Sequence, residues 1–127
     1  MEDDVMDYYS FLSKVITVNG TDEEEIFTVT QKDGRLEVQV TNGSGKRKIY
    51  ERSFDQADTK QIELNGLKGA DQFIIDENVS SKIGLILDGG EGDDRYDLKG
   101  NIRNKIFDRK SENNQFINTR RSNKELE

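Results

Sequence analysis

Two stretches, NGLKGADQFII at residues 65–75 and DGGEGDDRYDL at residues 88–98, dominate the interpretation of this chain of 127 residues. Each stretch begins with a turn dipeptide, passes through a glycine-rich segment and ends in an aromatic residue with an aliphatic residue two positions later. The second stretch follows the first at a spacing of 23. The same spacing relates the turn dipeptides that begin at Asn19, Asn42, Asn65 and Asp88, and the aromatic residues Phe27, Tyr50, Phe73 and Tyr96. Two series in the same phase indicate an internal repeat.

Short runs of alternating apolar residues lie on both sides of each turn. The pairs before the turn are Ile16/Val18, Val38/Val40, Ile62/Leu64 and Leu85/Leu87, and those after it are Phe27/Val29, Phe73/Ile75 and Tyr96/Leu98. A spacing of two puts both members of a pair on one face of a strand. Each repeat therefore predicts two strands. The second repeat departs from this pattern at Arg52, and a degraded fifth copy is predicted at Ser111–Phe116.

Two all-β architectures fit the repeat. In a β-solenoid each repeat is one rung, and the four aromatic residues Phe27, Tyr50, Phe73 and Tyr96 stack as a core ladder. In an antiparallel meander or sandwich the repeats are consecutive hairpins, as the turn sequences at residues 31–35 and 42–45 favour. We expect a β-solenoid-like (β-helix-like) stack of about four repeats with a hairpin-rich N-terminal half. The antiparallel sandwich or meander stays open as the alternative.

The chain is long enough for one domain. We expect residues 1–14 to be an N-terminal lead-in or cap, residues 15–118 a single repetitive β domain, and residues 119–127 a polar tail that ends in a cloning scar. Residues 3–13 predict either a short amphipathic helix or an extended segment. Their aromatic residues Tyr8, Tyr9 and Phe11 form either an exposed patch for a sugar or a protein partner, or a cover for the open end of the core. We interpret the whole as a fragment of a larger protein.

Composition excludes several classes of function. The chain has no His and no Cys, so we expect no Ser-His-Asp triad, no thiolate metal site and no catalysis. The net charge of −7 argues against nucleic-acid binding, and no apolar window is long enough for membrane insertion. Carboxylates are abundant, which leaves a carbohydrate-active domain as a weak alternative. Exposed strand edges also allow a homodimer through an edge strand.

The segment at residues 89–97 matches the pattern G-G-x-G-x-D-x-U-x, in which U is a large apolar residue, and residues 66–74 match it with Leu67 in place of the second glycine. These segments resemble the RTX-type calcium-binding β-roll repeats. The resemblance implies calcium as a cofactor and Asp71 and Asp94 as its ligands from stacked turns. Asp93 would be a further candidate ligand. The turn-forming residues would be Gly66, Gly69, Gly89, Gly90 and Gly92. The alternative is a metal-free turn, since only one turn in each repeat has the pattern.

The runs KIYERSF at residues 48–54 and TKQIELNGLKGADQF at residues 59–73 carry a wider resemblance. They look like β-rich linker segments of Gram-negative envelope proteins that combine a calcineurin-like metallophosphoesterase with a surface-antigen-type outer-membrane barrel. This resemblance, over about residues 8–110, implies a periplasmic or cell-surface location, with neighbouring domains of the parent protein as partners. We therefore expect a non-catalytic structural or interaction module, and a calcium-binding module as the alternative.

Overall fold

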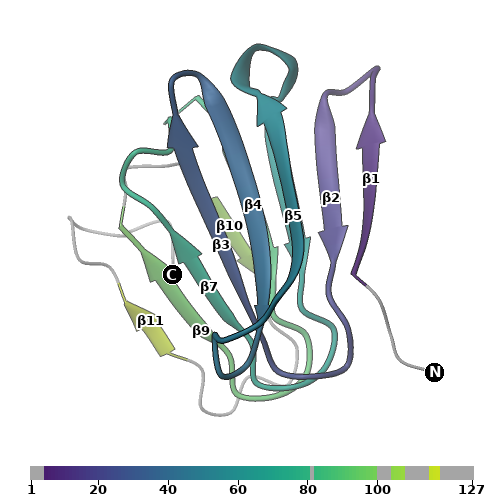
Figure 1. The fold of residues 1–127 in the computed structure, drawn as a ribbon, viewed down its shortest axis with the longest axis vertical. Helices are drawn as coiled ribbons and strands as arrows, with labels where there is room; N and C mark the ends of the chain where they lie inside the picture. Colours follow the sequence, from purple (N-terminus) through teal and green to yellow (C-terminus); the bar gives the residue numbers. More distant parts are fainter. Residues whose placement is uncertain (1–4, 81, 100–103, 108–114, 118–127) are drawn as a thin grey trace.

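The computed structural model describes residues 5–80, 82–99, 104–107 and 115–117, and this part of the chain is all-β (Figure 1). Its strands are β1 (Met6–Ser10), β2 (Val15–Asn19), β3 (Glu25–Lys32), β4 (Arg35–Asn42), β5 (Lys48–Asp55), β6 (Gln61–Asn65), β7 (Gln72–Ile75), β8 (Gly84–Asp88), β9 (Arg95–Leu98), β10 (Asn104–Phe107) and β11 (Gln115–Ile117). A 3-10 turn, η1 (Gln56–Asp58), precedes β6. Within the described ranges, no helix has the length and apolar character that a membrane span requires.

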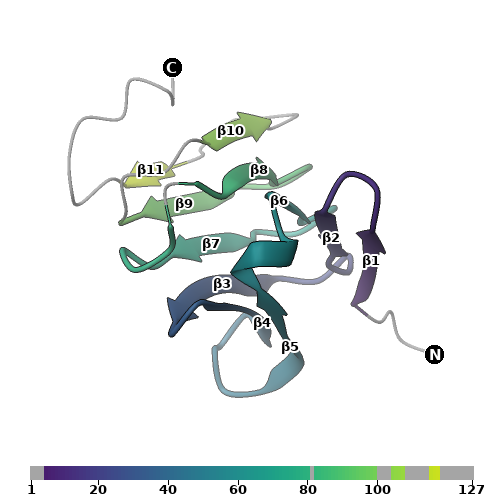
Figure 2. The same ribbon diagram turned by 90° about the horizontal axis from the view of Figure 1, so that it is seen from above.

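The strands form two mixed sheets that face each other across one core. Sheet A has the order β1-β2-β6-β8-β10, and sheet B has the order β11-β9-β7-β3-β4-β5. Seen from above, the two sheets lie as separate layers, with β8 nearest β9 (Figure 2). Successive strands change sheet at the glycine turns, since β2 leads into β3, β6 into β7 and β8 into β9. The sheets do not close into a barrel.

In both sheets, the parallel strands of the first, third and fourth copies pair with an offset of one or two repeat periods. In sheet A, Ile62 of β6 is aligned with Leu85 of β8, one period later, and with Ile16 of β2, two periods earlier. In sheet B, Phe73 is aligned with Tyr96 and with Phe27 at the same two offsets. Residues at equivalent positions of the first, third and fourth copies therefore lie side by side.

The second copy follows a different path, which explains the double offset between the first and third copies. It supplies β4 and β5, which add to β3 as antiparallel strands. Both predicted hairpin turns are confirmed: Asp33 and Gly34 have the positive φ of a two-residue turn, and Asn42 begins the turn into β5. The expected hairpins of the N-terminal half are present, but the second copy does not join the parallel pairs, so a stack that includes all four copies is wrong. A purely antiparallel meander is also wrong, since both sheets contain parallel pairs, whereas two facing mixed sheets are compatible with the sandwich-like alternative.

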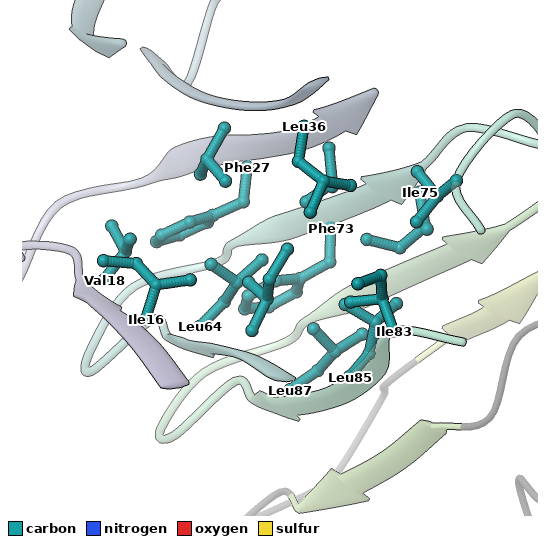
Figure 3. Close-up of a cluster of buried hydrophobic side chains, with 14 of the residues drawn as sticks. Ile16, Val18, Phe27, Leu36, Leu64, Phe73, Ile75, Ile83, Leu85 and Leu87 are labelled. Atoms are coloured by element: carbon teal, nitrogen blue, oxygen red, sulfur yellow. The ribbon is translucent and has the colours of Figure 1, made fainter. Parts of the chain in front are cut away.

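The core consists of the alternating residues that the sequence predicts. Its fully or nearly buried members include Ile16, Val18, Ile62, Leu64, Leu85 and Leu87 from sheet A and Phe27, Val29, Phe73, Ile75, Tyr96 and Leu98 from sheet B. Figure 3 shows Phe27 and Phe73 pointing toward Ile16, Val18 and Leu64 of the opposite sheet. Leu36, Val38 and Val40 of β4 extend this layer. Alternation on these strands thus gives both sheets an apolar inner face.

The N-terminal segment takes the extended form of the two that the sequence allows, because Met6–Ser10 pairs with β2 as an antiparallel strand. Polar contacts join it to sheet B: the Tyr50 hydroxyl donates to Asp7 Oδ2 at 2.7 Å, and Arg52 Nη1 lies 2.8 Å from the same oxygen. The Tyr9 hydroxyl donates to the Asp58 carbonyl. The predicted tail at residues 119–127 lies outside the described residues. So does most of the predicted fifth copy, apart from β11, where Phe116 aligns with Tyr96.

Candidate functional site

Three turns between the sheets share a pattern that places an acidic residue inside the molecule. In each turn the acid stands five residues after a glycine and two residues before the aromatic residue. The three sets are Gly20, Glu25 and Phe27; Gly66, Asp71 and Phe73; and Gly89, Asp94 and Tyr96. The second copy has Lys48 at the acidic position. Its hairpin is therefore marked in the sequence by the loss of the acid.

The three acids form what we call the carboxyl column, consisting of Glu25, Asp71 and Asp94. Asp71 Oδ1 accepts a hydrogen bond from the backbone N–H of Glu25 at 3.0 Å, and Asp94 Oδ1 accepts one from the backbone N–H of Asp71 at 2.9 Å. Glu25 accepts from the backbone N–H of Thr21 at 3.0 Å and from the Thr21 hydroxyl. Each aspartate therefore bonds the residue that occupies its own position in the preceding turn.

All three carboxyls of the column are buried. The exposed fractions are 2% for Glu25 and 1% each for Asp71 and Asp94. Burial raises the pKa of Asp71 to about 10, and the neighbouring carboxyls of Glu25 and Asp94 add to the rise. Burial also raises the pKa of Glu25, although its bonds to Thr21 oppose the shift. A charged group out of water is costly unless it is paired, so Asp71 and Glu25 favour their protonated forms.

The glycines that begin the turns leave room for these carboxyls. A methyl group at Gly66 would overlap Asp71 Oδ2 and lie 3.0 Å from the carbonyl oxygen of Gly89. A methyl group at Gly89 would overlap Asp94 Oδ2 and the Tyr96 hydroxyl. The space beside each glycine is thus occupied by the acid five residues later. This packing explains why the acid follows the glycine by five residues in each of the three turns.

The other predicted turn glycines allow the backbones of successive turns to touch. Gly90 has φ +73°, and a side chain there would overlap the carbonyl group of Leu67 in the preceding turn. The neighbouring Glu91 N–H donates to that same Leu67 oxygen at 2.8 Å. Gly69 and Gly92 also have positive φ and adjoin the backbone of the preceding turn. The glycine-rich segments are therefore shaped for direct backbone stacking.

The structure brings two of the three predicted calcium ligands together. Asp71 and Asp94 are neighbours in the column, whereas Asp93 is exposed and lies outside it. Across the described ranges, no group of three or more acidic residues has the arrangement of a metal cluster. Asp71 Oδ2 is buried and accepts no hydrogen bond from the described residues, so a proton or a cation on this oxygen would displace none of the described hydrogen bonds. The contact with Gly66 leaves little room for an ion on that side.

Three of the four rings predicted for the ladder stack directly. The centroids of Phe27 and Phe73 are 4.9 Å apart with an interplanar angle of 13°, and those of Phe73 and Tyr96 are 5.1 Å apart at 4°. Tyr50 is not part of this stack, contrary to the prediction. It lies on β5 opposite Val40, where burial and the bond to Asp7 raise its pKa. Antiparallel pairing of the second copy removes Tyr50 from the parallel register.

An open groove of about 1190 Å³ lies where the first glycine turn meets the turn between β4 and β5. Its lining includes Glu23, Glu24, Arg47, Lys48 and Ile49. The lining also includes Glu25 of the column, so it combines three glutamates with two basic side chains. It does not include Asp71 or Asp94.

Sequence reasoning found Asp71 and Asp94 but missed Glu25, the third member of the column. Glu25 belongs to an acidic run, Asp22–Glu25, that is typical of a solvated turn. The signal that identifies it is its position five residues after Gly20 and two before Phe27. Comparisons of the chain with protein-family models, with curated proteins and with solved structures found no match.

Proposed function

We propose that this chain is a non-catalytic structural module, a short β-solenoid-like spacer that holds neighbouring domains of a larger cell-envelope protein at a set separation. The observation that carries the proposal is the shared register of the two sheets. Strands one period apart pair in parallel in both sheets, and the rings of Phe27, Phe73 and Tyr96 stack along the same direction. Repeats that contact only their neighbours build elongated bodies.

Three independent layers of contact support stiffness along the stacking direction. Apolar side chains align in the core, carboxyls of the column bond the backbone of the preceding turn, and backbone bonds join successive turns, as from Gly66 to Asp88 and from Gly84 to Lys60. Each added strand extends a sheet by about 4.8 Å. A spacer of this kind sets a distance through its number of repeats.

The use of the buried acids supports the non-catalytic part of the proposal. Acid–base catalysis by a carboxyl pair needs both groups to reach a substrate. Asp71 and Asp94 instead each accept a backbone N–H bond and are almost completely buried. The two carboxyls therefore bind one turn to the next.

A duplication tests the spacer directly. Repeating residues 66–88 inserts one whole period and preserves the register of every later strand. The proposal predicts a folded protein that is longer by about 4.8 Å, measured by small-angle X-ray scattering and circular dichroism. The matched control repeats residues 66–87, which shifts the register by one position and turns the apolar face of the added strand to solvent. Equal loss of structure in both duplications would count against the proposal.

Calcium binding is the second candidate function, favoured by the buried Asp71 Oδ2 that accepts no hydrogen bond from the described residues. Thermal melts with calcium, with magnesium and with a chelator test it. A specific ion at about 100 times its Kd stabilises the folded state by about 2.7 kcal/mol. A calcium-specific rise in Tm that Asp94→Ala abolishes would favour the binding module, whereas identical melts would favour the spacer.

The proposed location is the periplasm or cell surface of a Gram-negative bacterium, and the proposed partners are the adjoining domains, with a calcineurin-like phosphohydrolase among them. The sequence resemblance over residues 48–54 and 59–73 supports this assignment. Fractionation of cells that express the tagged parent protein tests it, and recovery of the protein in the cytosolic fraction would contradict it.

A further inference from the structure

Strand β1 forms one edge of sheet A. It stands first in the strand order and pairs with β2 on its other side. Asp7 and Tyr9 are partly buried on the inner face, where they bond to residues of sheet B and the adjoining turn. Met6, Tyr8 and Ser10 are exposed on the outer face. The edge thus offers unpaired backbone together with apolar side chains.

Exposed apolar side chains gather at this edge. Among the described residues, five large hydrophobic side chains are exposed, and four of them belong to β1 and the turn that follows it. Their exposed fractions are 50% for Met6, 57% for Tyr8, 83% for Phe11 and 99% for Leu12. The ring of Phe11 packs edge-on against Tyr9 at 5.0 Å. Clustered apolar exposure marks an interaction surface.

The neighbouring edge strand of sheet B, β5, differs from β1 because it has features that discourage pairing with another chain. Strand β5 is the open edge of sheet B, and it carries the exposed charged residues Lys48, Glu51, Arg52 and Asp55. Its pairing with β4 is also irregular at Val40/Thr41. Charges and bulges on an edge discourage pairing with other chains. In β1 the one charged residue, Asp7, points inward and is paired with Arg52.

We propose that β1 pairs antiparallel with β1 of a second copy of this chain, about a two-fold axis that passes through Tyr8. A two-fold axis normal to the sheet keeps inner faces on the same side, so opposed residues must share a face of the strand. Centring on Tyr8 places Tyr8 opposite Tyr8 of the other copy, Met6 opposite Ser10 and Asp7 opposite Tyr9. Centring on Asp7 would instead oppose two carboxylates. The Tyr8 register therefore joins apolar residues and places no like charges directly opposite each other.

Sedimentation velocity of the full chain over a range of concentrations tests the pairing. The wild type is expected to dimerise. Tyr8→Lys puts two ammonium groups against each other at the axis and weakens the dimer by about tenfold or more, since like charges directly opposite are destabilising and the apolar contact is lost. The matched control is Leu67→Lys, because Leu67 is the remaining exposed apolar residue at 42% among the described residues and lies far from this edge in the sequence. It is expected to leave the dimer unchanged.

A crosslink tests the register itself. The chain has no cysteine, so Tyr8→Cys introduces a single thiol. Directly opposed residues on paired strands have Cβ atoms about 4.5–5.5 Å apart, close to disulfide geometry. Tyr8→Cys is expected to form a covalent dimer under mild oxidation, whereas Leu67→Cys is expected to associate as the wild type does but to form little covalent dimer. A wild type that stays monomeric at its highest soluble concentration, or a Tyr8→Lys variant that dimerises as strongly as the wild type, overturns the proposal.

Discussion

The carboxyl column predicts that replacing Asp71 with asparagine stabilises the protein at neutral pH. Asparagine keeps an Oδ1 acceptor for the Glu25 N–H but cannot ionise. In the wild type, the pKa of Asp71 is raised from 3.8 in an ordinary setting to about 10 in the fold. One pKa unit corresponds to about 1.36 kcal/mol, so holding this proton at pH 7 costs about 4 kcal/mol relative to the unfolded chain.

The sign of the pH dependence follows from the raised pKa. The folded state binds the Asp71 proton more tightly than the unfolded state does, so the contribution of Asp71 to stability is complete below about pH 4. It is lost progressively as the pH rises from there toward about 10. The advantage of Asp71→Asn over the wild type is therefore near zero at pH 4 and grows to at most about 4 kcal/mol at pH 7.

Urea denaturation followed by circular dichroism at several pH values, in the presence of a chelator, measures this difference. The matched control is Asp93→Asn, which changes an exposed acid in the same turn as Asp94 and should alter the free energy of unfolding by less than about 0.5 kcal/mol. A variant Asp71→Asn that is less stable than the wild type at pH 7 would refute the reasoning. So would an advantage that does not change with pH, because only a titrating carboxyl produces that slope.

Three further predictions concern stability and use the same denaturation assay. Phe73→Ala removes the central ring of the stack and should cost about 3–5 kcal/mol, and a loss on the scale of a surface mutation would contradict the stack. Gly90→Ala should destabilise by more than about 1 kcal/mol, since the added methyl overlaps the Leu67 carbonyl and φ is positive; unchanged stability would mean that the two turns do not touch. Tyr50→Phe removes the bond to Asp7 and should cost about 1–3 kcal/mol, whereas an unchanged midpoint would show that this bond contributes nothing to stability.

Much of the fold could be predicted from local patterns. Alternation of apolar residues identifies the inner face of β2, β6 and β8, and Asp33-Gly34 identifies the first hairpin, because both features depend on a few neighbouring residues. The repeat period also predicts which residues of the third and fourth copies become neighbours. These features follow from strand geometry and turn conformation, which the residues themselves impose.

The pairing of the strands could not be predicted from the repeat period. Whether a copy pairs in parallel or folds back as a hairpin depends on contacts between residues far apart in the chain, so Tyr50 bonds Asp7 of β1 instead of joining the rings. The column likewise gains Glu25 only because β3 lies beside β7. The local pattern of residues was enough for the strands of the repeat, their inner faces and the period, but not for β1. The choice of partner strand, and the burial that raises the pKa of Asp71, arose only when distant segments packed together and excluded water.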